Sequence, residues 1–496
     1  MRPYSELDAA ALAEETRSGR RSAAQTVAQC FERIGALDEP LGVFLSTERA
    51  RAEARALELD RALARGEPGG ALCGVPVALK SNMCLEGFES NCGSRMLERW
   101  RAPYTATFVE RLLEAGAVPV GMTNMDEFAM GSSSENSAFK PSRNPWAREY
   151  TPGGSSSGSA VAVAAGIVPL AFGSDTGGSV RQPAALCGIH GFKPSWGRVS
   201  RYGLIAFGSS LDQVSPFARS VRDLELAMQV VSGRDARDAT CLDLDPLQPL
   251  VPDDERSLAG VRIGVPREYL PPSAPAEVAA AVRGALDVLR ALGAELREIS
   301  LPHTEYAIPA YYVVATAEAS SNLARFDGVR YGLRLPGTGS LQSMFAATRG
   351  AGFGPEVKRR ILLGTYVLSA GYHDEWYGRA LKVRGLIARD FERAFEEVDL
   401  VAGPTSPTTA FRLGERAADP VAMYLADALT VPASLAGLPA ISTPCGFSVG
   451  PPALPIGLQL VGPARADASV LRVARAFEAA TQFARARPPL ATGAAR

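Results

Sequence analysis

The sequence predicts an α/β fold in which one large mixed β-sheet is covered by helices on both faces. Short apolar runs typical of strands alternate with helical patterns between residues 74 and 175, and the connections are short. The same alternation returns at residues 261–300 and again after residue 400. Because strands occur on both sides of a helix-rich stretch, we expect one large domain with a helical insert at about residues 305–400.

The N-terminal half begins with helices and continues as alternating strands and helices. Apolar residues at helical spacing predict three N-terminal helices, at 10–19, 22–37 and 47–66. The expected elements that follow are strand 74–80, helix 107–116, strand 117–124, helix 157–167 and strand 168–175. We therefore expect residues 1–70 to form a helical region that packs on the core, and residues 71–485 to form the α/β domain.

The C-terminal half repeats this pattern around the insert. Ser220 is placed to cap a helix over 221–233, and the polar, proline-rich stretch 245–260 is expected to be a surface excursion or a linker. A glycine-rich break at 348–356 divides the insert, and residues 486–496 are expected to be a flexible tail. The other expected elements are strand 261–266, helix 275–293, strands 294–300, 400–407, 440–447 and 456–462, and helix 468–483.

Composition limits the classes of function. The 496 residues carry 52 Lys and Arg against 53 Asp and Glu, a net charge of −1, so no overall field attracts the chain to nucleic acid or anionic lipid. The seven cysteines are scattered without CxxC spacing, which argues against a metal site or a disulfide framework and for reduced, buried thiols. The sequence has no signal-peptide core and no run of about 18 apolar residues, so we expect a cytoplasmic protein without a membrane span.

Two stretches rich in glycine and serine lie on either side of the strand expected at 168–175. The first, TPGGSSSGSAVAVAAG (151–166), precedes a helix, where backbone N–H groups favour anions. It lacks the Gly-Lys-Ser/Thr ending of a P-loop and the spacing of a dinucleotide fingerprint. The second, AFGSDTGGSVRQPA (171–184), carries an acid and several glycines and serines after the strand. Taken singly, a glycine-rich turn is more simply explained by close helix–strand packing.

Three residues taken together indicate catalysis. Lys80 ends an apolar strand, Ser155 follows two glycines, and Ser179 follows Asp-Thr-Gly-Gly. The two serines are 24 positions apart, which leaves room for one helix and one strand back to the same edge of the sheet. Burial favours the neutral amine of a lysine, so Lys80 can act as a base in a loop region without histidine. Ser155 can relay the proton of Ser179 to Lys80, which is the logic of a catalytic triad.

The turn before Ser179 can also stabilise a negatively charged oxygen. The backbone N–H groups of Thr176, Gly177 and Gly178 are candidates for an oxyanion hole, because glycines let the backbone come close to a ligand. Each triad residue alone has a simpler explanation, a solvated or ion-paired lysine or a loop or capping serine. The combination and its order predict a catalytic site.

These residues resemble the amidase signature family. The resemblance implies a single α/β fold with a mixed sheet between helical layers, and hydrolysis of carboxamides through an acyl-serine. It also implies that Ser179 is the nucleophile, that Ser155 is the bridging serine preceded by a cis peptide bond, and that Lys80 is the base. The family usually has an aspartate where this chain has Ser81 and a glycine where it has Ser157. The matching segments are GVPVALK (74–80), PGGSSSGSAVAVAAGIVPLAFGSDTGGSVRQPA (152–184) and CGIHGFKPSWGRVSRYGL (187–204).

A narrower resemblance extends over about residues 5–485. It is to the amidases that serve as the glutaminase subunit of tRNA-dependent amidotransferases acting on Glu-tRNA(Gln) and/or Asp-tRNA(Asn). The resemblance implies a heterotrimer in which this chain, without a cofactor of its own, releases ammonia from glutamine. A partner subunit then uses ATP and Mg²⁺ to amidate the tRNA-bound acid, contacts most of the tRNA, and is held by a small third subunit. The segments include TNMDEFAMGSSSENSAFKPSRNPW (123–146), EASSNLARFDGVRYG (318–332) and MYLADALTVPASLAGLPAIS (423–442).

A glutamine substrate agrees with other residues in these segments. An α-amino acid needs an anion for its ammonium group and a cation for its carboxylate, and the fork of an arginine suits a carboxylate. Asp427 and Arg360 match the expected pair, with Tyr311 nearby. Arg359 is the alternative to Arg360, and a charge on a helix surface is the simpler role for either. Asp126 is left out of the site because a structural role fits it equally well.

Three hypotheses follow. The first is the glutaminase subunit of a tRNA-dependent amidotransferase. The second is a free-standing amidase for a small or lipidic carboxamide, which shares the triad but needs neither the Asp427–Arg360 pair nor partner subunits. The third is a scaffold that only retains the fold, which predicts loss of a triad residue, and all three are present. We take the first hypothesis as the prediction.

Overall fold

A computed structural model describes residues 3–249, 257–336 and 339–492, whose strands form one eleven-stranded sheet. The strand order is β1-β3-β2-β4-β6-β5-β10-β11-β9-β7-β8. β2 pairs in parallel with β3 and β4, and β7 with β8 and β9, whereas β10 runs antiparallel to β5 and β11, so the predicted mixed sheet is confirmed. The strands are β1 (Phe44–Thr47), β2 (Pro76–Lys80), β3 (Val118–Thr123), β4 (Leu170–Asp175), β5 (His190–Lys193), β6 (Gln213–Ala218), β7 (Arg262–Pro266), β8 (Glu295–Ile299), β9 (Leu400–Pro404), β10 (Ala440–Phe447) and β11 (Pro455–Val461).

Helices make up most of the remaining regular structure. The α-helices are α1 (Ala9–Arg17), α2 (Ala23–Leu41), α3 (Arg49–Ala64), α4 (Thr107–Glu114), α5 (Ser157–Ala164), α6 (Arg181–Cys187), α7 (Val221–Val231), α8 (Ala276–Ala291), α9 (Ala307–Asn322), α10 (Leu341–Gly352), α11 (Pro355–Leu368), α12 (Arg379–Glu397), α13 (Pro420–Tyr424), α14 (Val431–Leu435), α15 (Asp467–Ala480) and α16 (Pro489–Thr492). Shorter helices are η1 (Tyr4–Glu6), η2 (Arg95–Leu97), η3 (Glu127–Ala129), η4 (Arg267–Tyr269), η5 (Pro302–Tyr306), η6 (Leu323–Arg325), η7 (His373–Gly378), η8 (Leu425–Asp427) and η9 (Phe483–Arg485).

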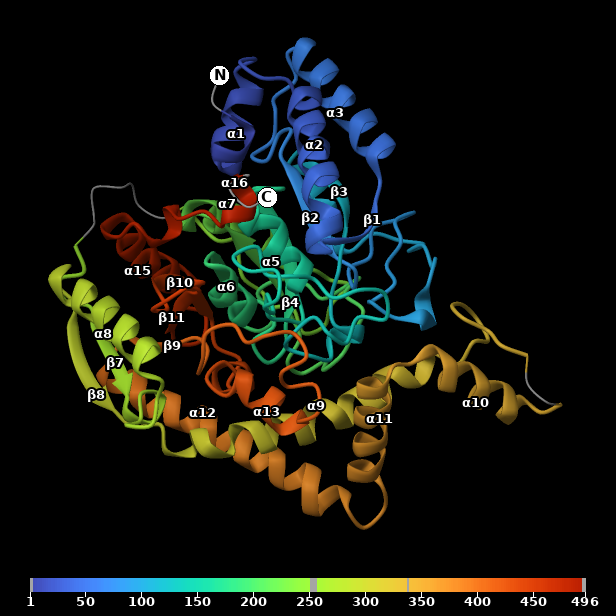
Figure 1. Ribbon diagram of the computed structural model, residues 1–496, viewed down its shortest axis with the longest axis vertical. Coiled ribbons are helices and arrows are strands. Elements are labelled where there is room, and N and C mark those ends of the chain that lie inside the picture. Colours follow the sequence, from blue (N-terminus) through green and yellow to red (C-terminus); the bar gives the residue numbers. More distant parts are fainter. Residues whose placement is uncertain (1–2, 250–256, 337–338, 493–496) are drawn as a thin grey trace.

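The helices cover both faces of the sheet. α8 and α15 lie on one side of β10 and β11, and α6 lies on the other (Figure 1). α5 packs next to α6 and contacts β2, β3 and β4. All of its residues are buried, and its small side chains allow a close approach: a Cβ on Gly158 would lie 2.3 Å from the Val43 carbonyl oxygen. This close packing holds the loop that leads into α5 against the sheet.

Three strands of the sheet were not predicted. β1 lies among the N-terminal helices and pairs with the edge of β3, while β5 and β6 lie between residues 187 and 218, where no element was expected. β1 has only four residues, and β5 and β6 contain Gly191 and Pro216, residue types that are depleted in strands. Pairing with neighbouring strands, not local pattern, forms these elements.

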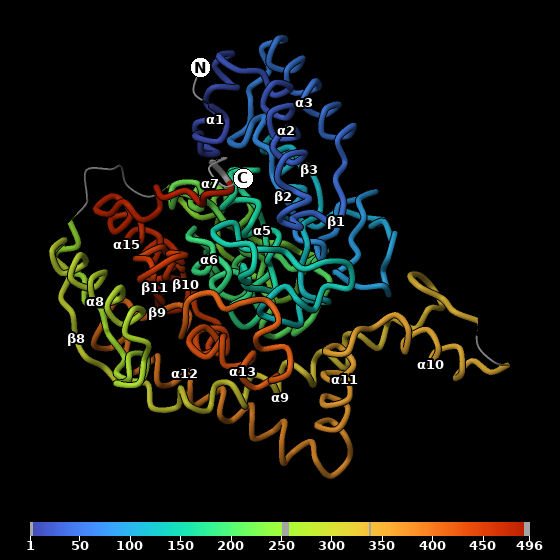
Figure 2. Tube along the Cα trace, viewed as in Figure 1, coloured from blue at the N-terminus to red at the C-terminus, as the bar shows by residue number. Residues whose placement is uncertain are grey.

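The stretch between β8 and β9 is helical. α9 packs against α11 and α12, and α10 projects away from the body of the molecule (Figures 1 and 2). The expected glycine-rich break is confirmed, because α10 ends at Gly352 and α11 begins at Pro355. Of the proline-rich stretch 245–260, residues 250–256 lie outside the described residues. In the C-terminal stretch, α16 is followed by residues 493–496, which also lie outside them, and Leu490 packs against the core.

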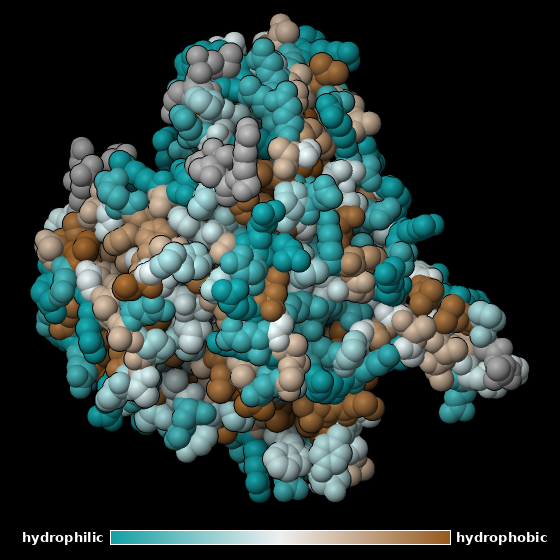
Figure 3. All heavy atoms as spheres, viewed as in Figure 1, coloured by the Kyte–Doolittle hydropathy of each residue, from teal (hydrophilic) through white to brown (hydrophobic). Residues whose placement is uncertain are grey.

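Two large clusters of buried apolar side chains form most of the core, beside a small one of Leu186, Ala410 and Leu454. One extends from the N-terminal helices through the sheet to α15, and the other joins the helical insert to α14 and the loops near η3. On the face shown in Figure 3, hydrophilic side chains dominate over the N-terminal helices. In the part of the chain that the structure describes, no helix combines the length and the apolarity needed to cross a bilayer. All seven cysteines are free thiols, and all but Cys241 are buried.

Candidate active site

Lys80 is the last residue of β2 and is completely buried. Its Nζ lies 2.7 Å from Ser155 Oγ and 3.0 Å from Ser174 Oγ. Burial lowers the pKa of Lys80 to about 7, although the carboxylates of Asp126, Asp212 and Asp175 act in the opposite direction. The amine is therefore available as a base near neutral pH, as the sequence predicted from the position of Lys80 at a strand end.

Ser155 lies in the loop before α5, where the helix and the sheet hold it next to Lys80. The peptide bond between Gly154 and Ser155 is cis. Gly154 donates its N–H to Gln182 Oε1 at 3.0 Å, and the Ser155 carbonyl oxygen accepts the N–H of Asp126 at 3.2 Å. These bonds fix the backbone of the loop on both sides, so the hydroxyl of Ser155 has a defined position.

Ser179 follows β4 in the turn before α6 and is 7% exposed. The N–H of Ser156 donates to the Ser179 carbonyl oxygen at 3.2 Å, which brings the two serine-rich loops together. Within residues 3–249, 257–336 and 339–492, no hydrogen bond joins Ser155 Oγ to Ser179 Oγ. The structure thus joins Lys80 to Ser155 directly and Ser179 to this pair through the backbone, and catalytic hydrogen bonds are often longer before substrate binds.

An ion pair that the sequence analysis did not identify holds the Ser179 turn. Arg181 Nη2 lies 2.9 Å from Asp175 Oδ1, and both side chains are completely buried. Arg181 also donates to the Thr430 carbonyl oxygen, Gln459 Oε1 and Ser434 Oγ. Burial alone would raise the pKa of Asp175, but Arg181 outweighs it and the pKa is lowered. The sequence did contain a signal for this ion pair: Asp175 and Arg181 flank a turn of small residues that follows an apolar strand.

The three residues predicted for the oxyanion hole form this turn. Thr176 donates its hydroxyl to Asp212 Oδ1 at 2.7 Å, and the Gly177 carbonyl oxygen accepts the Thr430 hydroxyl at 2.7 Å. Gly178 has φ +141°, and a Cβ there would lie 2.1 Å from Thr430 Oγ1, so only glycine fits. The N–H groups of these three residues donate to no other group in the described chain, which leaves them available to an anion.

Arg360, rather than Arg359, is the inward-facing arginine of α11. Its side chain is buried, and its Nε donates to Glu356 Oε1 at 2.8 Å. Arg359 also pairs with Glu356, but half of its side chain (51%) is exposed. Burial would lower the pKa of Arg360, but nearby tyrosines and Glu356 hold it above its usual value. The Arg360 guanidinium lies over three aromatic rings, those of Phe207, Tyr312 and Tyr424, at 5.0–5.7 Å.

Asp427 and Tyr311 lie near enough to Arg360 for its charge to lower the pKa of each against the effect of burial. Asp427, in η8, is buried, accepts a hydrogen bond from Ser132 Oγ on one carboxylate oxygen, and has no described partner for the other, Oδ1. Burial raises its pKa to about 7, with Ser132 and Arg360 opposing the shift. Tyr311, in α9, lies so close to Gly177 that a Cβ there would be 2.7 Å from the ring. The insert therefore reaches the turn that carries Thr176–Gly178.

Among the described residues, the side chain of Ser81 makes no hydrogen bond to the Lys80 amine. Its hydroxyl donates to Asn91 Oδ1 at 3.0 Å and accepts the Asn91 N–H at 3.0 Å. The other family departure, Ser157, accepts a hydrogen bond from Ser134 Oγ at 2.8 Å. Asp126 accepts the N–H groups of Ser134 and Asn136, both at 3.0 Å, which is a structural role.

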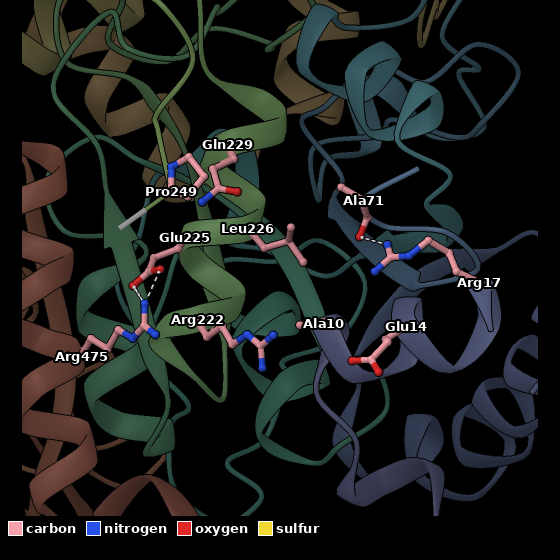
Figure 4. A pocket seen from close by; sticks show the side chains of 10 residues that line it. All are labelled: Ala10, Glu14, Arg17, Ala71, Arg222, Glu225, Leu226, Gln229, Pro249 and Arg475. Atoms are coloured by element: carbon pink, nitrogen blue, oxygen red, sulfur yellow. Dashed lines mark hydrogen bonds and ion pairs between the residues drawn. The ribbon is translucent and has the colours of Figure 1, made fainter. Parts of the chain in front are cut away.

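A separate cavity of about 300 Å³ lies between α1 and α7 and contains none of the predicted site residues (Figure 4). Arg475 pairs with Glu225 in it, and Arg17 donates to the Ala71 carbonyl oxygen. Among the described residues, no group of three or more His, Cys, Asp or Glu side chains could hold a metal ion.

Comparison with known proteins agrees with the geometry of the site. The family model described as Amidase matches residues 25–471. The chain belongs to the amidase family. This amidase is 57% identical over 475 residues to the A subunit of glutamyl-tRNA(Gln) amidotransferase from Moorella thermoacetica, with 95% of each chain covered. It is 53% identical to the protein of the same name from Roseiflexus castenholzii, with 97% of each chain covered.

Solved structures give the same result. The crystal structure of the A subunit of glutamyl-tRNA(Gln) amidotransferase from Thermotoga maritima matches this amidase with a TM-score of 0.78 and 41% identity, over 96% of this chain and 95% of that one. A bacterial aryl acylamidase of the amidase signature family matches with a TM-score of 0.83 and 25% identity, over 99% of both chains. The predicted family and its fold are therefore confirmed.

Proposed function

We propose that this amidase is the glutaminase subunit of a glutamyl-tRNA(Gln) amidotransferase. The observation that carries the proposal is the identity of 57%, over 95% of the chain, to the A subunit of such an enzyme. The buried Lys80–Ser155 contact supports the same conclusion, because it provides a base where an amidase needs one.

In the proposed mechanism, Ser179 Oγ attacks the side-chain amide carbon of glutamine. Its proton passes through Ser155 to the neutral amine of Lys80. The N–H groups of Thr176, Gly177 and Gly178 stabilise the negative oxygen of the tetrahedral intermediate. The C–N bond then breaks, and the proton returns through Ser155 to the leaving nitrogen, which departs as ammonia. Water attacks the glutamyl ester by the same route and releases glutamate.

The substrate-binding residues give this chemistry its specificity. In the proposal, the Arg360 guanidinium binds the α-carboxylate of glutamine, and Asp427 binds its ammonium group through the oxygen that has no described partner. Tyr311 packs beside the turn of Thr176–Gly178 and, in the proposal, borders the bound amide. A free-standing amidase for lipidic amides has no need of this buried pair of opposite charges.

The released ammonia is used elsewhere in the proposed complex. We propose a partner subunit that activates Glu-tRNA(Gln) and/or Asp-tRNA(Asn) with ATP and Mg²⁺ and makes most of the tRNA contacts, and a small third subunit. The net charge of −1 supports an indirect role in tRNA binding. The proposed complex works in the cytoplasm, where translation consumes the amidated tRNA.

The decisive experiment is a pull-down of the tagged chain from its native cell extract. Recovery of an ATP-using, tRNA-binding subunit together with a small third protein supports the proposal, whereas an active chain recovered alone favours a free-standing amidase. The purified chain is expected to hydrolyse glutamine slowly and the reconstituted complex faster. Ser179→Ala should abolish glutaminase activity in both, and wild-type rates in that variant would exclude Ser179 as the nucleophile.

A further inference from the structure

Lys80 makes two more contacts than a proton relay requires, and both are to Ser174. The Lys80 Nζ lies 3.0 Å from Ser174 Oγ and 3.5 Å from the Ser174 carbonyl oxygen, in addition to its 2.7 Å contact with Ser155 Oγ. Both residues are almost completely buried, and they are brought together by the parallel pairing of β2 with β4. Water therefore does not supply the partners of this amine, and the protein must.

The geometry of an amine explains why these contacts matter. A neutral lysine has one lone pair and two N–H bonds. To take a proton from Ser155, the lone pair must face Ser155 Oγ, and both N–H bonds then need acceptors elsewhere. Ser174 offers two, its hydroxyl and its carbonyl oxygen. We propose that Ser174 is a positioning residue that orients the Lys80 amine toward Ser155.

Asn82 holds Ser174 in turn. The Asn82 Nδ2 lies 3.0 Å from Ser174 Oγ, while Asn82 Oδ1 is buried and accepts no hydrogen bond within the described residues. In either orientation of the amide, a polar atom of Asn82 contacts Ser174 Oγ. Asn82, the second residue after Lys80, therefore supports Ser174, whereas Ser81 bonds to Asn91.

The charged groups around Lys80 have a different effect. Burial lowers its proton affinity, and the nearby carboxyl groups of Asp126, Asp212 and Asp175 raise that affinity. The Cys92 thiol also lies nearby, but burial raises its pKa well above its usual value, so it stays uncharged near neutral pH. None of these groups accepts a hydrogen bond from Lys80 in the described chain, so the carboxylates change how readily the amine is protonated but not where its lone pair points.

The inference rests on the proposed triad, and its test uses a reaction that does not depend on the natural substrate. An alkyl fluorophosphonate reacts with the nucleophile: the Ser179 Oγ–P bond forms, the P–F bond breaks, fluoride leaves, and the hydroxyl proton passes to Lys80. The rate constant of labelling is measured from pH 5 to 9 for the full chain and its variants. The rate of glutamine hydrolysis is measured in parallel over the same range.

Ser174→Ala should lower the labelling rate constant about 10- to 100-fold, part of the usual contribution of a general base. It should also move the acid limb of the pH profile to lower pH, because the ammonium form loses an acceptor that it needs more than the amine does. Ser174→Thr, which keeps the hydroxyl, should restore both. Asn82→Ala should give an intermediate loss with KM for glutamine within about twofold of wild type, because the substrate contacts are elsewhere.

Ser159→Ala is the matched control. Ser159 is equally buried, and its hydroxyl donates to the carbonyl oxygen of Phe172, which lies on the same strand as Ser174. Among the described residues it makes no hydrogen bond to Lys80. The positioning role would be overturned by any of three results. Ser174→Ala could be labelled as fast as Ser159→Ala, its acid limb could stay at the wild-type pH, or Ser174→Thr could fail to restore the lost rate. Labelling that survives Ser179→Ala would instead overturn the triad itself, so the two failures are distinguishable.

Discussion

At the scale of single residues, the site depends on two buried groups that ionise near neutrality. In the proposed mechanism, Lys80 must be neutral to accept a proton, and Asp427 must be charged to bind an ammonium group. Burial is the largest cause of both shifts, and it brings the pKa of each residue to about 7. The lysine is moved down and the carboxyl group up, because burial disfavours whichever form is charged.

The first prediction concerns pH. Both groups must lose a proton to be functional, so kcat/KM for glutamine should fall below about pH 7 with a slope that approaches two. Asp427→Asn should weaken glutamine binding and reduce this slope to one, leaving the titration of Lys80. The measurement is glutaminase activity from pH 5 to 8.5. A slope of two in the Asp427→Asn variant would show that Asp427 is not the second group.

The second prediction separates the two arginines of α11. Arg360→Lys should raise KM for glutamine about 10- to 100-fold, because an ammonium group cannot replace the fork of a buried guanidinium. Arg359→Lys, on the exposed side of the same turn, should change KM less than about twofold. Steady-state kinetics measure both values of KM, and each variant is the matched control for the other. Equal effects would contradict the assignment of Arg360.

The sequence contained more information on this choice than the motif alone. The buried positions of α11 include Val357, Arg360, Gly364 and Val367, at spacings of three and four residues that define one helix face. Arg359 is off this face. The arginine that points inward could thus have been identified from periodicity. By contrast, the contact between Ser132 and Asp427 joins residues 295 positions apart, and no local pattern carries it.

At the scale of elements, prediction succeeded where a segment has a strong pattern of its own. β2, β3, β4 and β7–β11 all lie within the expected ranges or within one residue of them. Most of them are apolar runs between turns, whereas β8 has only two apolar residues, Leu296 and Ile299. β5 and β6 were not predicted, because they form strands only by pairing with their neighbours in the sheet. The same holds for α6, whose seven residues contain Pro183 and begin directly after Ser179–Val180.

The third prediction concerns the crossing of α9 and α11. Gly364 is one turn after Arg360 on the same face, and a Cβ there would lie 1.9 Å from the Thr316 carbonyl oxygen. Gly364→Ala should force the two helices apart, destabilise the protein by about 1–3 kcal/mol and raise KM for glutamine by displacing Arg360. Thermal unfolding and kinetics measure the two effects.

Gly350→Ala is the matched control for that variant. Gly350 lies in α10 of the same insert, with nothing within 4 Å of the added Cβ. The substitution should stabilise the protein by about 0.5–1 kcal/mol, because alanine is the better helix former. If Gly364→Ala behaved like Gly350→Ala, the close crossing of α9 and α11 would not position Arg360.

At the scale of the whole molecule, one sheet connects the two ends of the chain. β1 comes from the N-terminal seventy residues and forms one edge, while β10 and β11 lie in its middle. The first buried cluster likewise combines Leu12 and Val27 with Val77 and Leu458. The division between N-terminal region and α/β domain that the sequence suggested therefore crosses a shared sheet and a shared core.

The fourth prediction follows from this sharing. A fragment that begins at residue 71 loses β1 and leaves β3 as an unpaired edge over an exposed apolar core, so it should aggregate or remain unfolded. The intact chain should lose its near- and far-UV circular dichroism in one coincident transition. A soluble fragment that melts cooperatively would show that residues 1–70 are dispensable.

The helical insert leaves the sheet at β8 and returns at β9, and both of these strands are hydrogen-bonded to β7. Because both strands run parallel to β7, the end of β8 and the start of β9 lie at opposite ends of the strands, and the insert connects them. The Lys80–Ser155–Ser179 machinery is built from segments outside the insert. The triad and the proposed substrate-binding residues Tyr311 and Arg360 thus come from different parts of the chain. In the proposed site, substitutions at Arg360 can change which substrate is bound while Lys80, Ser155 and Ser179 stay the same, so one catalytic scaffold can come to serve different amides.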